Sequence, residues 1–305
     1  MNNTPVIHVE HLHKTYGDFT AVEDVSFEVH AGEIFGIIGP NGAGKTTITE
    51  MIEGLRQPDR GTVRVLGLDP RAQGNQLRQH IGIQLQQAVL PEKIKVWEAL
   101  ALFASFYRRT TDWRALLDQW HLSEKRNATF GSLSGGQKQR LFIALALVND
   151  PDVVFLDELT TGLDPQARRE TWDHVRAIRE RGKSVVLVTH FMDEAERLCD
   201  RIGLIDHGQI AALDTPLNLV QGLSAEHRVR FSLNHGFDPS LLQAVRGVSR
   251  VTRDGDEIVV YGTGSLMAHV AATLAEHDLA PADLRAEQPN LEDVFLALTG
   301  HAIRN

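Results

Sequence analysis

A glycine-rich segment from Gly39 to Thr47 constrains the fold of this chain more than any other feature. Its sequence, GPNGAGKTT, follows an apolar run, Ile34 to Ile38, that is typical of a buried strand. Apolar residues from Ile48 onward then recur at the spacing of a helix. Strand, glycine loop and helix form the context in which G-x-x-x-x-G-K-[ST] binds phosphate. The sequence therefore predicts an α/β fold built around a phosphate-binding turn.

Glycines in this loop let backbone N–H groups turn inward toward an anion, and the start of the following helix adds partial positive charge. Lys45 in the first turn of a helix is disfavoured by about 0.3–1 kcal/mol, and a bound triphosphate removes that cost. The alternative, a surface lysine on a glycine turn, leaves this cost unexplained. Thr46 offers a hydroxyl group to Mg²⁺. The predicted nucleotide-binding residues are Gly39, Pro40, Asn41, Gly42, Ala43, Gly44, Lys45, Thr46 and Thr47.

Composition predicts a soluble, cytoplasmic protein of a reducing compartment. The chain has 305 residues, enough for two domains, and 31 basic against 40 acidic side chains give a net charge of −9. That balance, without a block of Lys or Arg, argues against a nucleic-acid-binding protein. Cys199 is the only cysteine, so no internal disulfide is expected. The longest apolar run, Leu141 to Val148, has eight residues against the ~20 that span a bilayer, and the N-terminus lacks an apolar signal segment.

Two strand patterns follow each other along the first part of the chain. Residues 6–30 alternate apolar and polar side chains, which suits half-buried antiparallel strands. The runs 34–38, 153–156 and 185–188 are continuously apolar, which suits a parallel sheet buried on both faces. The sequence thus predicts an α/β core accompanied by an antiparallel β subdomain.

Between about residues 88 and 148 the strand pattern stops, and a helical subdomain is predicted. Residues 94–108 and 112–121 have the periodicity of helices whose apolar faces carry aromatic side chains. We interpret these aromatic residues as core, although a helical insertion of this kind can also present a docking surface. They include Trp97, Phe103, Trp113 and Trp120.

The first domain is predicted to cover residues 1–222, and a small C-terminal accessory domain residues 223–305. Strand and helix patterns in the second domain follow the order β-α-β-β-α-β, which is that of ferredoxin-like α+β folds. A hairpin is expected at Gly255. A last helix is expected to begin with a capping box formed by Asn290 and Asp293.

Acidic residues and a histidine follow the apolar strands. Asp157 and Glu158 end one buried strand, and His190 ends the next. Ligands in open parallel sheets bind at these strand ends. We expect Asp157 to hold Mg²⁺ through water, Glu158 to act as the catalytic base for the attacking water, and His190 to contact a γ-phosphate. The alternatives are a solvated acidic turn and a structural histidine.

A second glycine pair occurs in Leu133-Ser-Gly-Gly-Gln137, just before a helix predicted over residues 138–148. Paired glycines at the start of a helix form an anion-binding nest like that of the first loop. A flexible entry into a helix is the alternative. The chain would then carry two phosphate-binding helix ends.

The sequence LSGGQ lies between the glycine loop Gly39–Thr47, a Walker A pattern, and the strand that ends at Asp157, a Walker B pattern. In this position it resembles the signature of the ATP-binding subunits of ABC transporters. The resemblance covers residues 6–222 and implies a P-loop ATPase core that binds ATP and Mg²⁺. It implies that Tyr16 stacks on adenine, and that Gln86 contacts Mg²⁺ and relays to a membrane partner. It also implies that Asp164 lies at a dimer seam and that His190 is the switch histidine.

The same resemblance implies a shared site between two subunits. Ser134 and Gly136 would contact the γ-phosphate of ATP held by the opposite subunit. Because the chain has one Walker A loop, it would pair with a second copy or a homologue. One departure is Leu159, which occupies the position where the family usually has proline. Leucine there is expected to loosen the turn that carries Glu158 and so to affect the hydrolysis rate.

Two later segments narrow the resemblance to one subfamily of these ATP-binding subunits. The segments Phe191–Gly208 and Asn290–Gly300 are similar to those of drug-exporter (daunorubicin-resistance type) ATPases. This similarity implies an ATP-hydrolysing subunit that powers export through a separate transmembrane permease, and that is peripheral on the inner face of the cell membrane. Two alternatives stay open: a soluble non-transport ABC protein acting on ribosomes, DNA or a regulatory partner, and a nucleotide-dependent binding module with feeble hydrolysis.

Overall fold

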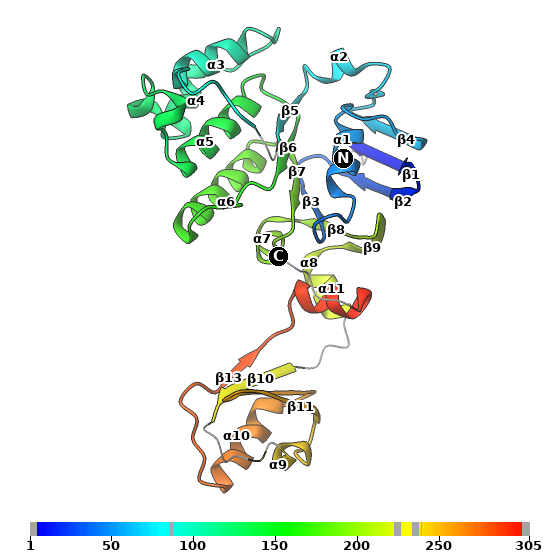
Figure 1. Cartoon of the computed structure of the whole chain (residues 1–305), viewed down its shortest axis with the longest axis vertical. Coiled ribbons are helices and arrows are strands. Elements are labelled where there is room, and N and C mark those ends of the chain that lie inside the picture. The colour runs from blue at the N-terminus through cyan, green and yellow to red at the C-terminus, as the bar shows by residue number, and fades with distance from the viewer. Residues whose placement is uncertain (1–4, 86–87, 223–226, 234–237, 239, 301–305) are drawn as a thin grey trace. The chain divides into compact units, whose positions relative to one another are not determined.

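The computed structural model describes residues 5–85, 88–222, 227–233, 238 and 240–300. The chain forms two compact units, of which the first runs to Pro216 and the second begins at Leu217 (Figure 1). None of the described helices combines the length and the apolar character that a membrane crossing requires.

A six-stranded sheet is the centre of the first unit, and its strands run in the order β5-β6-β7-β3-β8-β9. All neighbours pair in parallel except β8 and β9, which form an antiparallel pair. Every residue of β3, β6 and β7 is buried, which confirms the sheet predicted from the continuous apolar runs. The strands are β3 (Ile34–Ile38), β5 (Ile81–Gln84), β6 (Val153–Asp157), β7 (Ser184–Thr189), β8 (Arg201–Asp206) and β9 (Gln209–Asp214).

An antiparallel sheet in the order β2-β1-β4 forms a second layer of this unit. Its strands are β1 (Ile7–Tyr16), β2 (Phe19–Val29) and β4 (Arg60–Val65). The alternating pattern read in residues 6–30 therefore predicted these first two strands correctly. Helix α1 (Lys45–Ile52) contacts all three of these strands and also β7, so one apolar core joins the two sheets.

Helices complete the first unit (Figure 1). They are α2 (Gly74–Leu77), α3 (Val96–Ala104), α4 (Trp113–Gln119), η1 (Ser123–Lys125), η2 (Phe130–Ser132), α5 (Gly135–Ala146), α6 (Pro165–Glu180) and α7 (Met192–Leu198). α3 and α4 are shorter than the predicted helices. α3 ends where the Ser105 hydroxyl donates to the Leu102 carbonyl oxygen at 2.6 Å, a local bond that competes with continuation of the helix. Trp120 is buried as predicted, whereas Trp97 and Trp113 are half-buried and their rings pack 6.2 Å apart.

The start of α5 was predicted wrongly. The helix begins at Gly135 rather than at residue 138, because Ser134 caps it. The backbone N–H of Gln137 donates to the Ser134 hydroxyl oxygen at 3.3 Å, and the Gln137 side chain accepts from the Ser134 N–H at 3.0 Å. The glycine pair therefore lies inside the first turn of the helix and not before it.

The second unit contains an antiparallel sheet in the order β11-β12-β10-β13. Its apolar core includes Phe231, Ile258 and Val260 from the sheet and Leu242 and Val270 from helices. The order of elements is the β-α-β-β-α-β order that the sequence predicts, and Gly255 lies in the predicted turn with φ +61°. The elements are α8 (Pro216–Gly222), β10 (His227–Ser232), α9 (Ser240–Gln243), β11 (Val248–Asp254), β12 (Glu257–Gly262), α10 (Leu266–Glu276), β13 (Arg285–Glu287) and α11 (Leu291–Thr299).

Candidate functional site

The predicted catalytic residues follow adjacent strands of the six-stranded sheet. The glycine loop follows β3, His190 follows β7 and Glu158 follows β6, and these three strands are neighbours. Because the strands are parallel, their carboxyl ends meet at one edge of the sheet, where ligands bind in such folds. Gln86, which the sequence places after the next strand, β5, lies outside the described residues.

Lys45 points back into the glycine loop. Its Nζ donates to the carbonyl oxygens of Gly39 at 2.8 Å and of Pro40 at 2.9 Å, and the residue is 6% exposed. Burial lowers the pKa of Lys45, against the opposing pull of the Glu158 and Asp157 carboxylates. The loop therefore holds the Lys45 ammonium group close enough to the Asp157 and Glu158 carboxylates to interact with them electrostatically.

The loop places the start of α1 where an anion can bind. The N-cap residue, Gly44, has φ +101°, and no side chain caps the helix or places an acidic group in its first turn. The first N–H groups of a helix then remain available to a bound phosphate. A Cβ at Gly44 would lie 2.4 Å from the Ala21 carbonyl oxygen, so only glycine fits there.

The turn between β8 and β9 forms part of the wall behind this loop. The Gly208 N–H donates to the Ala43 carbonyl oxygen at 2.9 Å, and the Gly208 carbonyl oxygen accepts from the Glu23 N–H at 2.8 Å. A Cβ at Gly39 would lie 2.1 Å from the Ile205 carbonyl oxygen. The same turn thus contacts the glycine loop and the antiparallel sheet.

Asp157 and Glu158 differ in their surroundings. Asp157 is 8% exposed, and burial, followed by the negative charge of Glu158, raises its pKa to about 6. The Glu158 carboxylate lies 3.1 Å from His190 Nδ1, and both side chains are largely buried. The structure therefore brings Lys45, Asp157, Glu158 and His190 to one edge of the sheet, as the sequence predicts.

Leu159, the departure from the family pattern, is packed in the core with 1% of its surface exposed. The turn before it is held by the Glu158 N–H, which donates to the Val188 carbonyl oxygen at 2.8 Å. Glu158 has φ +47°, a left-handed conformation that non-glycine residues adopt uncommonly. The effect of Leu159 on the hydrolysis rate stays a prediction.

Ser134, Gly136 and Asp164 line a different cavity, of about 340 Å³, which no described residue of the glycine loop lines. Asp164 also caps α6, because its carboxylate accepts from the N–H groups of Gln166 at 3.0 Å and Ala167 at 2.9 Å. This confirms the predicted start of that helix. Ser134 and Gly136, assigned to the opposite subunit's nucleotide, are thus grouped with Asp164, assigned to the dimer seam.

Tyr16 lies at the end of β1 and is 40% exposed. Its ring is contacted by two cations: the guanidinium of Arg56 lies 5.2 Å from the ring centroid and the ammonium of Lys14 5.6 Å. These cations were not foreseen from the sequence, because Arg56 reaches the ring from beyond α1.

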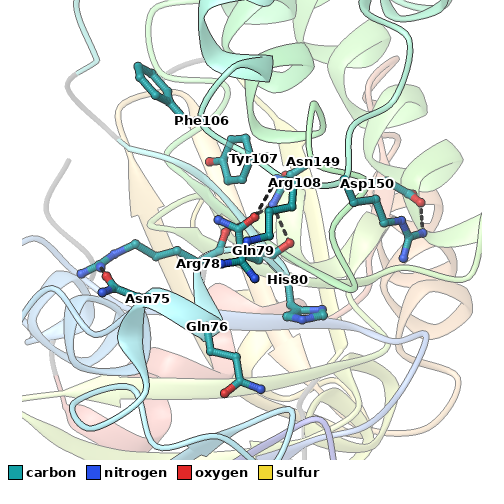
Figure 2. Close-up of a pocket in the computed structure, with 11 residues that line it drawn as sticks. Asn75, Gln76, Arg78, Gln79, His80, Phe106, Tyr107, Arg108, Asn149 and Asp150 are labelled. Carbon is teal, nitrogen blue, oxygen red and sulfur yellow. Dashed lines mark hydrogen bonds and ion pairs between the residues drawn. The ribbon is translucent and has the colours of Figure 1, made fainter.

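A larger cavity, of about 860 Å³, is lined by the segments before β5, after α3 and before β6 (Figure 2). The segment before β5 supplies Arg78 and His80, and the segment after α3 supplies Tyr107, Arg108 and Arg109. Asn149 is buried at its floor, where its side-chain amide donates to the Ile81 carbonyl oxygen at 2.9 Å. Its own side-chain oxygen has no hydrogen-bond partner among the described residues.

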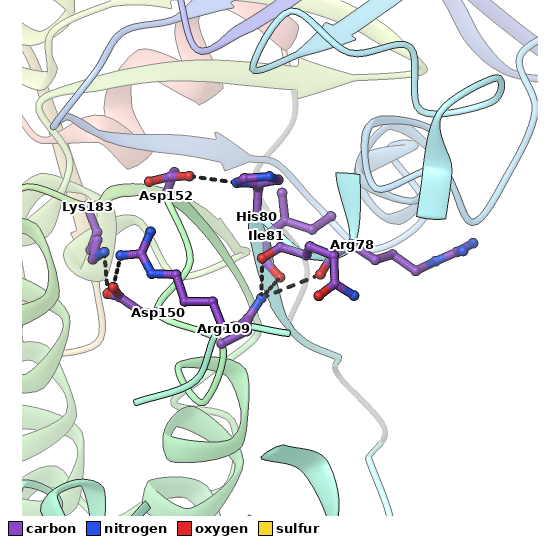
Figure 3. A network of polar contacts seen from close by, with 9 residues as sticks. Arg78, His80, Ile81, Arg109, Asp150, Asp152 and Lys183 are labelled. Carbon is purple, nitrogen blue, oxygen red and sulfur yellow. Dashed lines mark hydrogen bonds and ion pairs between the residues drawn. The ribbon is translucent and has the colours of Figure 1, made fainter. Parts of the chain in front are cut away.

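A polar network borders this cavity (Figure 3). Asp150 pairs with Lys183 at 2.6 Å and also with Arg109, and these cations lower the Asp150 pKa against the effect of burial. His80 Nδ1 lies 3.2 Å from the Asp152 carboxylate. The network fixes the segments before β5 and β6 against the end of the helical region.

Two buried carboxyl groups near the site were not identified from the sequence. Glu53 follows α1 and is 3% exposed, and Glu194 in α7 is fully buried. Glu53 belongs to no motif, and Glu194 lies in the segment Phe191–Gly208 without a role assigned to it. An acidic residue at an otherwise apolar helical position, as Glu53 is after Ile48, Met51 and Ile52, is the signal that could have pointed to it.

The fold and the loop geometry define a P-loop nucleoside triphosphatase. A family model described as ABC transporter matches residues 22–161. The Nod factor export ATP-binding protein I of Rhizobium etli is 39% identical over 294 residues, which cover 94% of this chain and 91% of the relative. The protein of the same name from Ralstonia nicotianae is 36% identical over 316 residues, covering 100% of this chain and 97% of the relative.

Solved structures of ABC transporter ATP-binding proteins have a similar fold. A structure of an ATP-binding subunit of an ABC transporter has a TM-score of 0.65 and 28% identity, covering 71% of this chain and 92% of its own. A dimeric bacterial ABC transporter cassette has a TM-score of 0.61 and 28% identity, covering 68% of this chain and 98% of its own. The chain belongs to the family of ABC transporter ATP-binding proteins, and it is an ATPase subunit.

Proposed function

We propose that this chain powers an export-type ABC transporter of the drug-exporter (daunorubicin-resistance type) group through a separate permease. The observation that carries the proposal is the grouping of Lys45, Glu158 and His190 at one sheet edge, with Ser134 and Asp164 around a different cavity. Such a division suits two subunits that complete each other's sites. Relatives named as export proteins, matched over nearly their whole length, support the direction of transport.

ATP is proposed to bind at the Lys45 loop together with Mg²⁺. The donor set suits a hard divalent cation, because carboxylate and hydroxyl oxygens are the ligands that Mg²⁺ prefers. A cation would also offset the burial and the repulsion from Glu158 that raise the Asp157 pKa to about 6. Asp157, Thr46 and Gln86 would hold the ion. When bound, Mg²⁺ offsets the negative charge of the phosphate groups.

The remaining residues have roles that follow from their positions. Glu158 orients and deprotonates the attacking water, and His190, 3.1 Å away, contacts the γ-phosphate and holds the carboxylate in place. Tyr16 stacks on adenine. Ser134 and Gly136 contact the nucleotide of the opposite subunit, and Asp164 lies at the seam between the two subunits. The opposite subunit is a second copy of this chain.

The permease is proposed to contact the cavity of about 860 Å³ between the helical segment and the core. Arg78, Arg108 and Arg109 line this cavity, so an acidic cytoplasmic loop of the permease would complement its charge. Contact there would hold the chain on the inner face of the membrane. Movement of the helical segment would then reach the permease directly.

ATP hydrolysis by the purified chain tests the proposed roles. Glu158→Gln is expected to bind ATP, lose at least about 100-fold in kcat and accumulate as a closed dimer in size-exclusion chromatography with ATP and Mg²⁺. Lys45→Ala is expected to lose ATP affinity. The matched control is Glu180→Gln, an exposed residue at the end of α6, which should behave as the wild type. Undiminished turnover by Glu158→Gln would contradict its assignment as the base.

Co-expression with the permease tests the partner. Arg108→Glu is expected to leave the ATPase activity of the isolated chain unchanged, and to abolish its stimulation by the permease in vesicles. Equal stimulation of the wild type and Arg108→Glu would contradict docking at this cavity. Failure of the chain to purify with any membrane permease would favour the alternative, a soluble ABC protein with a regulatory partner.

A further inference from the structure

A fully buried carboxyl group, to which no role has been assigned, lies in the helix that follows His190. Glu194, in α7, has none of its surface exposed. Its Oε1 accepts from the Trp172 indole N–H at 3.2 Å. Its Oε2 is also buried, and it completes no hydrogen bond within the described part of the chain. A buried carboxyl group without a cationic partner is costly, so its presence calls for a physical reason.

The neighbours of this carboxyl group belong to the two turns that carry the catalytic pair. Burial raises the pKa of Glu194, whereas the hydroxyl groups of Thr189 and Thr160 and the Trp172 indole lower it. Thr189 directly precedes His190, and Thr160 follows Glu158 by two residues. One side chain on α7 is therefore within electrostatic reach of both turns.

The hydroxyl groups of Thr189 and Thr160 differ in their hydrogen bonding. The Thr189 hydroxyl oxygen accepts from the Phe191 N–H at 3.0 Å, which shapes the turn around His190. The Thr160 hydroxyl is fully buried and faces Glu194 closely enough to lower the Glu194 pKa as a hydrogen-bond donor, but it makes no well-aligned hydrogen bond among the described residues. Thr160 Oγ1 and Glu194 Oε2 are thus a donor and an acceptor that influence each other without a well-aligned bond.

We propose that Glu194 is a positioning residue that sets the Glu158–His190 pair, by receiving the Thr160 hydroxyl on one side and supporting the Thr189 turn on the other. The inference rests on the proposed roles of Glu158 and His190 in hydrolysis. Glu194 does not touch the nucleotide. It acts through the two turns, so its removal is expected to affect turnover and not ATP affinity.

Substitution of Thr160 in the full chain provides the first test. Thr160→Val keeps the shape and removes a hydroxyl group that has no completed bond, so the melting temperature should not fall. The proposal predicts that kcat falls about tenfold while KM for ATP changes less than about twofold, since a hydrogen bond to a carboxylate is lost only in the active arrangement. Thr160→Ser, which restores the hydroxyl group, should recover most of the wild-type kcat.

A double variant provides the second test. Glu194→Gln leaves one acceptor oxygen, which the Trp172 indole N–H occupies, so it loses the bond from the Thr160 hydroxyl as Thr160→Val does. Combining the two substitutions should therefore lower kcat no further than the slower single variant does. Asp193→Asn is the matched control, because Asp193 is the exposed neighbour of Glu194 on the same turn and pairs only loosely with Arg168, at 3.6 Å. It should retain the wild-type kcat.

Three results would overturn the inference: wild-type kcat in Thr160→Val, failure of Thr160→Ser to recover turnover, or multiplication of the two effects in the double variant. Comparison of Thr160→Val with Thr160→Ser tests the role of the Thr160 hydroxyl group even if Glu194→Gln does not fold. A wild-type chain that binds but does not hydrolyse ATP would contradict the roles given to Glu158 and His190, and that result is seen before any Thr160 variant is compared.

Discussion

Replacing Glu53 by glutamine should change how the stability of this protein depends on pH. Glu53 follows α1, is 3% exposed, and has its pKa raised to about 8 by burial and then by the negative charges of Asp157 and Glu50. The carboxyl group is therefore protonated at neutral pH in the folded chain and ionised in the unfolded chain. Glutamine has nearly the same shape as the protonated acid and does not titrate.

The size of the effect follows from the pKa difference. The folded pKa, about 8, lies above the ordinary value of 4.5, so the stability contributed by the protonated group is complete below about pH 4.5 and is lost as pH rises toward 8. The difference of about 3.5 pKa units corresponds to about 5 kcal/mol in full, of which about 3 kcal/mol is lost by pH 7 and about 4 kcal/mol by pH 8, at about 1.4 kcal/mol per unit.

Urea unfolding between pH 5 and pH 8, without nucleotide, measures this loss. The wild type should lose several kcal/mol of unfolding free energy relative to Glu53→Gln across that range, while Glu180→Gln should follow the wild type. The raised pKa of Asp157 arises mainly from its own burial and from Glu158, which all three proteins share, so most of its contribution is common to them. Parallel curves for the wild type and Glu53→Gln would refute the reasoning.

Three further outcomes are expected. Gly82→Ala should lower the unfolding free energy by about 1–3 kcal/mol in urea titrations, because its Cβ would lie 1.9 Å from the Ala146 carbonyl oxygen; an unchanged midpoint would contradict that clash. Asn290→Ala removes the cap on the Asp293 N–H, at 3.1 Å, and should cost about 1 kcal/mol, seen as faster hydrogen exchange in α11 with no change elsewhere. The Cys199 thiol is buried and its pKa is raised well above the usual range, so iodoacetamide should label it slowly at pH 8 and rapidly in urea.

The sheet edge that carries the catalytic residues could be predicted, because each of these residues is marked by its neighbours in the sequence. Lys45, Asp157 and His190 each follow an apolar run, and parallel strands place their carboxyl ends at a common edge. The order in which the strands lie side by side could not be read, since β7 separates β6 from β3 through pairings between distant residues. The cap at Ser134 was readable in principle from Gln137, three residues later, but the glycines favoured a later start.

The surroundings of the buried carboxyl groups could not be read for a related reason. Glu194 lies between Asp193 and Glu196 in a polar stretch of sequence, and only tertiary packing makes it a core residue. The apolar residues before Glu53 indicate burial, but not which elements cover it. The same holds for the contact between Arg56 and the Tyr16 ring, which joins the end of a strand to the segment after α1. Periodicity identifies a face of a helix, but not which elements cover that face.

The hydrogen bonds of Gly208 to Ala43 and Glu23 have a consequence for how this protein can be cut. The family model ends at residue 161, yet the backing of the phosphate loop is supplied by Ile205 and Gly208, which lie well beyond it. A fragment that stops at residue 161 would keep the whole glycine loop but lose the backbone groups that pack behind it. A piece that keeps these contacts must extend through Gly208.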